Sequence, residues 1–214
     1  VIRIKLPEAI VTGWSENVTA EQEADITAAI HKAAAVVIGP GLGQEAGAER
    51  LLDLVLQEAK KLPELPVVID ADGLNLLAKK RLYSTLGRQY VLTPHLREMS
   101  RLSGKSVQEI ADDMTSAVMG QQAGATIVLK DARTLVSDGD WLYINLSGNS
   151  ALSTGGSGDV LSGMIGGLLA QGCTQRTAAT LAVYMHGLTA EQYCESAPPH
   201  CMLARDILEM IPKI

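Results

Sequence analysis

The sequence predicts an α/β fold in which helices flank a central, mostly parallel sheet that also contains an antiparallel hairpin. Two apolar runs carry most of this prediction, VVIGPGLG at 36–43 and PVVIDADGLNLL at 66–77. Each is a β-branched stretch that ends in Gly or Asp and leads into a helical pattern, as buried parallel strands do. Residues 44–61 between them place apolar side chains at helical spacing and end in two lysines, which the helix dipole favours. These segments together predict a βαβ unit.

The other elements follow from the same periodicities. The turn Gly139-Asp140 between the apolar runs RTLVSD and WLYIN favours an antiparallel hairpin, so the sheet is expected to be mixed. The remaining expected elements are a helix at 20–33, a strand at 90–93, a helix at 106–123, a strand at 125–130, and helices near 157–171, 174–195 and 202–211.

Length and composition are those of one globular domain. A chain of 214 residues with 47% hydrophobic and 20% charged residues can bury a full core, so we expect a single domain over 1–214. The pattern IRIKLPEAIVTGW begins directly at Val1 and resembles a strand, and we therefore expect that an N-terminal segment is missing. The formal charge of −6 argues against binding of nucleic acid, since Lys and Arg supply that affinity.

The cysteines and apolar runs indicate a cytoplasmic protein. Cys173, Cys194 and Cys201 cannot all pair within the chain and lack the close spacing of a zinc site. No apolar run reaches the roughly 20 residues that cross a bilayer, and residues 1–15 do not resemble a signal peptide. We therefore expect no membrane association.

The segment GGSGDVLSG at 155–163 is the strongest candidate for chemistry. Three glycines within four residues leave the backbone open to an anion at the start of an apolar helix. Free N–H groups and the positive end of the helix dipole favour phosphate there. Asp159 would lie in the first helical turn, beside that pocket. The structural alternative is that Asp159 caps the helix and the glycines only form a turn. The length of the string favours the functional interpretation, although it lacks the GK[ST] of a Walker loop.

With LLAQG after it, this string resembles a known family. Ribokinase-like enzymes place a Gly-Asp pair at a helix start, and the longer string is similar to that of the ADP- or ATP-dependent NAD(P)H-hydrate dehydratases. Four further motifs match in order and spacing: IGPGLG at 38–43, VVIDADGLNLL at 67–77, LTPHLREMSRL at 92–102 and IVLKDART at 127–134. Five collinear motifs are more specific than any one of them, and they span nearly all of the chain.

The resemblance implies a repair reaction. In that family the 6-hydroxylated (hydrated) form of NADH or NADPH is restored by phosphorylation of the hydroxyl and elimination of phosphate. Hydroxide is a poor leaving group and phosphate a good one, so such an enzyme needs a base for the hydroxyl and dipoles for the phosphoryl group. The resemblance also implies Mg²⁺, which nucleotide phosphates usually bind during transfer. Either ADP or ATP could use one backbone anion hole, so the donor stays open.

The family's functional residues map onto matching positions of this chain. Asp159 would be the base, and the amides of Gly156, Ser157 and Gly158 the anion hole. Gly41, His95 and Asp159 match positions that contact the hydrated cofactor. The positions that match contacts to the adenine nucleotide are Lys130, Asp131, Ala132, Arg133, Thr134 and Gly158.

Several of these residues have plain structural alternatives. Gly41 could belong to a simple strand-to-helix turn, although ligands bind at the carboxyl ends of parallel strands. His95 could start a helix without a ligand. Asp70 and Asp72 could bind a metal or a phosphate-linked water, and Asp72 could equally cap a helix. His186 is expected to be a packing histidine.

The chain also departs from the family pattern. The family usually has Gly after the strand-ending lysine, where this chain has Asp131, a carboxylate that would repel phosphate unless it points away or binds metal. Two other functions stay open. A small-molecule kinase acting on a sugar or vitamin alcohol would use the same Asp159 chemistry, and a non-catalytic nucleotide-binding subunit is favoured if the N-terminal segment is absent from the protein. The resemblance also implies a homo-oligomer.

Overall fold

The computed structural model describes residues 9–14, 18–119 and 124–214. Within these residues six strands form one sheet in the order β1-β2-β3-β4-β5-β6. The strands are β1 Val36–Ile38, β2 Val67–Ile69, β3 Tyr90–Leu92, β4 Thr126–Leu129, β5 Leu135–Ser137 and β6 Leu142–Ile144. The first four pair in parallel, and β5 and β6 add an antiparallel hairpin. The predicted mixed α/β sheet is confirmed.

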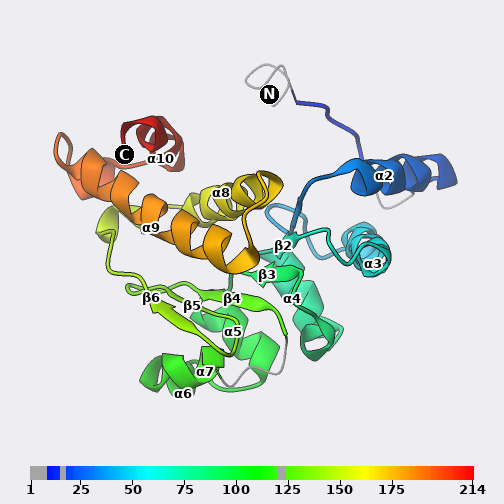
Figure 1. Ribbon diagram of the computed structural model, residues 1–214, viewed down its shortest axis with the longest axis horizontal. Helices are drawn as coiled ribbons and strands as arrows, with labels where there is room; N and C mark the ends of the chain where they lie inside the picture. Colours follow the sequence, from blue (N-terminus) through cyan, green and yellow to red (C-terminus); the bar gives the residue numbers. More distant parts are fainter. Residues whose placement is uncertain (1–8, 15–17, 120–123) are drawn as a thin grey trace.

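Helices cover both faces of this sheet, with α8 and α9 on one side and α4 to α7 on the other (Figure 1). The helices are α2 Ala20–Lys32, α3 Ala46–Lys61, α4 Asp72–Lys79, α5 Leu96–Ser103, α6 Val107–Asp112, α7 Met114–Met119, α8 Ser157–Ala170, α9 Gln175–Cys194 and α10 Ala204–Met210. The short 3₁₀ turns are η1 Tyr83–Thr85, η2 Ser150–Leu152, η3 Pro199–Cys201 and η4 Ile211–Lys213.

Alternate residues of the parallel strands enter two different cores. Val68, Val91 and Val128 pack in one cluster with the apolar side chains of α8 and α9. Their neighbours Ile69 and Leu92 pack in the other cluster, with α3, α4 and α5. Because successive side chains of a strand point to opposite faces, burial on both sides requires the continuous β-branched runs seen in the sequence.

One predicted helix, 106–123, is wrong as a single element. The structure has α6 and α7 in its place, separated at Asp113, whose backbone has a non-helical φ of −144° and ψ of 74°. The Asp113 side chain accepts a hydrogen bond from the Ser116 amide at 2.9 Å, so it starts the second helix. Aspartate favours such local bonds over the middle of a helix. Residues 120–123 lie outside the described residues.

The prediction of a single domain over 1–214 that lacks an N-terminal segment stays a prediction, and residues 1–8 of the strand-like start lie outside the described residues. In the part of the chain that the structure describes, the helices are too short or too polar to cross a membrane.

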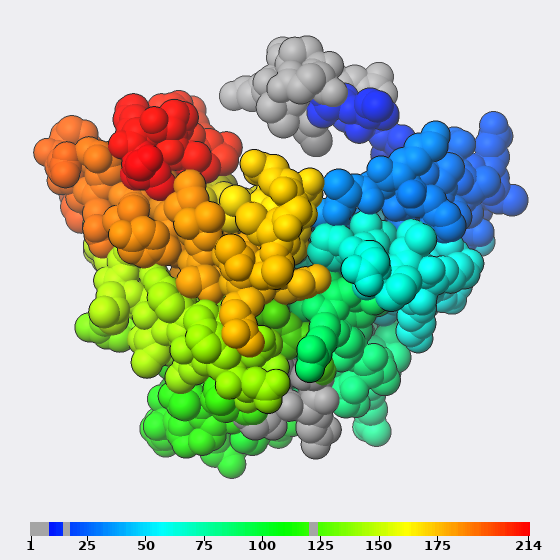
Figure 2. All heavy atoms as spheres, viewed as in Figure 1, coloured from blue at the N-terminus to red at the C-terminus, as the bar shows by residue number. Residues whose placement is uncertain are grey.

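Helix α8 lies against the edge strand β1 through a glycine. A Cβ added at Gly166 would come within 2.3 Å of Cγ2 of Val37, whereas one added at Gly167 would meet nothing within 4 Å. Figure 2 shows α8 in yellow, between α9 in orange and the blue and cyan segments around α2 and α3. The missing side chain at Gly166 therefore sets how closely α8 approaches the sheet.

We expect Gly166→Ala to lower the free energy of unfolding by about 1–3 kcal/mol, because the β-branched Val37 cannot easily yield. Gly167→Ala in the same helix should leave stability unchanged or raise it by up to about 1 kcal/mol, as alanine favours helix. Urea denaturation of both variants measures this difference. Equal effects would contradict the close approach of α8 to β1.

Candidate active site

The loops that follow β1, β2, β3 and β4 lie at one edge of the sheet, because parallel strands end on the same side. A Cβ on Gly39, which has a φ of +123°, would lie 1.8 Å from the carbonyl oxygen of Asp70. This contact holds the loop after β1 directly against the loop after β2, and it requires glycine. The close approach places Gly41, exposed and with open space around its α-carbon, at this edge.

Asp72 joins the same two loops. Its Oδ2 accepts a hydrogen bond from the Gly43 amide at 3.0 Å, and its Oδ1 accepts one from the Gln44 side chain at 3.1 Å. The N-cap of α4 is Ala71, which makes no side-chain capping bond. The alternative that Asp72 caps this helix is therefore wrong, and its carboxylate supports the glycine turn instead.

His95 is the N-cap of α5 at the end of β3. Its Nδ1 accepts hydrogen bonds from the amides of Arg97 at 3.1 Å and Glu98 at 3.2 Å, and the Glu98 carboxylate accepts from the His95 amide at 2.8 Å. Because Nδ1 is an acceptor, the ring proton resides on Nε2. The side chain is 48% exposed. His95 therefore starts the helix and also presents an N–H donor at the edge.

Lys130 follows β4 and connects this edge to α8. Its Nζ lies 2.8 Å from Oδ1 of Asp70, and the hydroxyl of Ser162 lies 2.5 Å from Oδ2 of the same carboxylate. The backbone of Lys130 pairs with that of His95 across the ends of β3 and β4. A Cβ added at Gly158 would lie 3.3 Å from the Lys130 Nζ. His95, predicted to bind substrate, and Lys130 and Gly158, predicted to bind nucleotide, are thus neighbours.

The glycine-rich turn opens helix α8. Gly156 is its N-cap in the left-handed conformation, with a φ of 89°, and makes no side-chain cap. The Ser157 amide bonds to the Thr154 carbonyl at 3.3 Å, whereas the amides of Gly158 and Asp159 have no acceptor among the described residues. The Ser157 hydroxyl donates to the Leu152 carbonyl at 2.7 Å and fixes the turn. The free donors of this turn thus include Gly158 and Asp159, while the Ser157 amide is engaged.

Asp159 lies in the first turn of α8 and is exposed. It forms no capping bond, so the alternative that it caps the helix is wrong. Lys130 pairs with Asp70 instead, and within the described ranges the Asp159 carboxylate has no ion-pair partner. An unpaired carboxylate next to free amides and an ammonium group is able to accept a proton from a hydroxyl group held there.

His186 supports the turn from α9. Its Nε2 donates to the Ser157 carbonyl across 3.1 Å, and its side chain is buried. Burial, with a further contribution from the charge of Lys130, lowers the pKa of His186 to about 4. The expectation of a packing histidine fits this neutral, hydrogen-bonded ring.

The loop after Lys130 is exposed. Asp131, Ala132 and Arg133 are accessible to solvent, and the Asp131 carbonyl accepts from the Thr134 hydroxyl at 3.4 Å. The Asp131 carboxylate forms no ion pair within the described residues. The loop therefore extends the edge that Gly158 and Lys130 begin, with its extra negative charge open to solvent.

Comparison with known proteins assigns the family. The family model described as NAD(P)H-hydrate dehydratase matches residues 1–213. The chain belongs to the NAD(P)H-hydrate dehydratase family. It is 41% identical over 198 residues to the ADP-dependent (S)-NAD(P)H-hydrate dehydratase of Neisseria meningitidis, covering 90% of this chain and 65% of that protein. The chain thus spans slightly less than two thirds of this relative's length.

Solved structures agree on the ribokinase-like fold. A ribokinase-like superfamily protein from Enterococcus faecalis superposes with a TM-score of 0.86 at 30% identity, covering 99% of this chain and 71% of that one. An ADP/ATP-dependent NAD(P)H-hydrate dehydratase from Bacillus subtilis, co-crystallized with ATP and Mg²⁺, superposes with a TM-score of 0.71 at 32% identity, covering 84% and 62%.

In this family member, sequence reasoning missed Ser162 and did not foresee what Asp70 binds. A signal for Ser162 was its position four residues after Gly158, which places the two on one face of α8. Asp70 was weighed as a metal or water ligand, but its two oxygens bind Lys130 and Ser162.

The described residues do not form a metal centre of their own. No group of three or more His, Cys, Asp or Glu side chains within them is arranged to hold an ion. Asp70 and Asp72 are already hydrogen-bonded, which leaves Asp159 and Asp131 as exposed carboxylates at the edge. This donor set fits Mg²⁺ that is held chiefly by nucleotide phosphates and waters, with one or two carboxylates.

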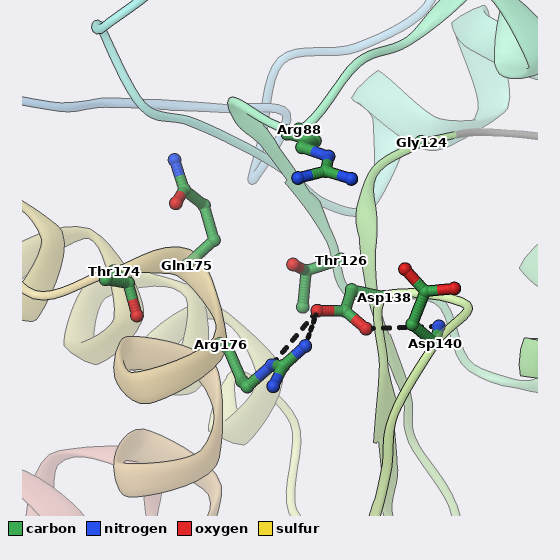
Figure 3. A pocket seen from close by; sticks show the side chains of 8 residues that line it. All are labelled: Arg88, Gly124, Thr126, Asp138, Asp140, Thr174, Gln175 and Arg176. Atoms are coloured by element: carbon green, nitrogen blue, oxygen red, sulfur yellow. Dashed lines mark hydrogen bonds and ion pairs between the residues drawn. The ribbon is translucent and has the colours of Figure 1, made fainter.

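A separate hollow of about 330 Å³ lies at the opposite edge, near the starts of β4 and α9. Figure 3 shows Arg88 pointing into it and Arg176 paired with Asp138. Asp138 and Asp140 offset the two arginines, and none of the candidate site residues lines it. We therefore assign no chemistry to this hollow.

The lowered pKa of His186 predicts how the stability of the protein depends on pH. The fold favours the neutral ring, so this contribution to stability is present above the unfolded pKa near 6.5 and is lost as the pH falls toward 4. Between pH 7 and 4 the free energy of unfolding of the wild type should decrease through His186 by up to about 3 kcal/mol, and we expect His186→Gln to lack this part of the decrease. Urea unfolding between pH 7 and 4 compares the two proteins. Parallel stability curves would show that His186 does not titrate this way.

Proposed function

We propose that this chain dehydrates hydrated NADH and NADPH, using an adenine nucleotide and Mg²⁺. The observation that carries the proposal is the exposed, unpaired Asp159 carboxylate beside the free amides of Gly158 and Asp159 and the ammonium of Lys130. Those donors suit the charge on a phosphoryl group in transfer, and the carboxylate suits the attacking hydroxyl.

The proposed reaction has two steps. In the first step Asp159 takes the proton of the 6-hydroxyl group while the oxygen of that hydroxyl bonds to the terminal phosphorus of the nucleotide. The bond between that phosphorus and the rest of the nucleotide breaks at the same time. The ring nitrogen then supplies an electron pair that expels the new phosphate from C6, and C5 loses a proton to form the ring double bond. Phosphate leaves where hydroxide would not.

We assign the binding roles from the family resemblance, and the position of each loop is compatible with them. Gly41 offers open backbone and His95 an Nε2–H donor, and we assign both to the hydrated cofactor. Residues 130–134 and Gly158 are assigned to the nucleotide. Mg²⁺ would neutralise its phosphates during transfer. ADP is the donor in the name of the Neisseria relative, and we propose ADP or ATP here.

We infer the cellular setting from the composition and from the family resemblance. The composition favours a cytoplasmic protein, and the family resemblance favours a homo-oligomer. Nucleic acid is not expected as a partner, since the net charge is −6, and a membrane is not expected, since no apolar run is long enough to cross one.

Given hydrated NADH, Mg²⁺ and ADP or ATP, the full-length protein should restore NADH absorbance and release phosphate in equal amounts. Asp159→Asn keeps the shape and removes the basicity, so turnover should fall by about 10²–10⁴-fold while the fold and nucleotide affinity are retained. Coupled absorbance and phosphate assays measure both. A small-molecule kinase would instead leave its phosphoryl group on an alcohol, and near-normal turnover of Asp159→Asn would exclude Asp159 as the base.

A further inference from the structure

Three polar side chains end the sheet face that packs on α8 and α9. Asp70, Thr93 and Lys130 each come two residues after one of the valines of that core. The period of two in a strand directs them to the same face as those valines. The contact of Asp70 with Ser162 of α8 agrees with this placement. The apolar core thus ends in a polar row below the N-terminal turn of α8.

Within this row Asp70 is the central acceptor. It is 1% exposed, and its two oxygens take Lys130 and Ser162, whereas the Lys130 side chain keeps 21% exposure. A buried ion pair contributes little net stability, because removing both charges from water offsets their attraction. The pair is better suited to fixing the position of Lys130, whose long chain otherwise samples many rotamers.

Lys130 is fixed at the place where an anion would bind. Its Nζ is next to Gly158, whose amide has no acceptor within the described residues. The hydroxyl of Thr93, a fully buried residue that directly follows β3, also lacks a hydrogen-bond partner within the described residues. The free Gly158 amide and the fixed Lys130 ammonium are neighbours, which is the arrangement that a phosphate needs.

We propose that Asp70 is a positioning residue that holds the Lys130 ammonium at the N-terminal turn of α8, where it binds the phosphates of the nucleotide. The proposed role of Asp70 rests on the proposed function in one respect, which is that the bound anion is a nucleotide phosphate. Asp70 itself touches no substrate and acts through Lys130. Ser162 fixes the same carboxylate from the next turn of α8, so the lysine and the helix are held in a constant relation.

A double-mutant cycle tests this by calorimetric titration with ADP and Mg²⁺. Asp70→Asn and Lys130→Met should each weaken ADP binding about tenfold or more, as for loss of a hydrogen bond to a charged group. The double variant should bind no more weakly than Lys130→Met alone, since Asp70 acts through the lysine. An Asp70→Asn effect of the same size in both backgrounds, or no effect in either, would overturn the proposal.

Asp138→Asn is the matched control, because it breaks the Asp138–Arg176 ion pair at the opposite edge, and it should leave ADP affinity unchanged.

A second experiment uses the wild-type protein, so its result does not depend on whether a variant folds. Lysine side chains are acylated with and without ADP, and peptide mass spectrometry measures the rate at each lysine. ADP should slow modification of Lys130 severalfold and leave the exposed Lys61 unaffected. Equal rates for Lys130 with and without ADP would also overturn the proposal. If Asp70 and Lys130 are coupled in ADP binding but the protein has no dehydratase activity, the proposed function is refuted and the role of Asp70 is retained.

Discussion

A carboxylate buried at a sheet edge must have its charge compensated, and at Asp70 this requirement connects three separate parts of the chain. The residue follows β2, its first partner Lys130 follows β4, and its second partner Ser162 belongs to α8. Removing either partner would leave buried charge less well satisfied, which costs more than the pair contributes. The position of α8 relative to the strands is therefore set by polar contacts at this end and by the close approach of Gly166 to Val37 farther along.

The sequence predicted the parallel strands and the helices that follow them because β-branched runs buried on both faces have few other structural solutions. It could not predict the break at Asp113, because a helical pattern of apolar residues continues across that position and the break depends on a local side-chain bond that starts a second helix there. The partners of Asp72 and Asp70 were also out of reach, since both depend on contacts between residues at least 28 apart in the sequence. The glycine-rich turn was located correctly, but which amides stay free depends on the bond from Ser157 to Thr154.

These details connect the fold to the chemistry. Helix α8 brings the free amides of Gly158 and Asp159 and the Asp159 carboxylate to the strand ends, and the lysine after β4 adds a fixed positive charge. His95 and Gly41 lie on loops of the same edge, with the loop after β2 between them, and we propose that a nucleotide and a second ligand meet there. The family to which the chain belongs is the reason that we propose a hydrated nicotinamide cofactor as the second ligand, while the geometry alone would also serve transfer to another alcohol.

Isotope tracing separates these possibilities most directly. If the full-length protein is given NADH hydrate with ¹⁸O in the 6-hydroxyl group, together with unlabelled nucleotide and Mg²⁺, that oxygen becomes the bridge to phosphorus and leaves with it. Mass spectrometry of the released phosphate should therefore find one ¹⁸O per phosphate, in amounts equal to the NADH formed. Label recovered in water, with unlabelled phosphate, would contradict phosphorylation of the hydroxyl and the role of the α8 turn in transferring that phosphoryl group.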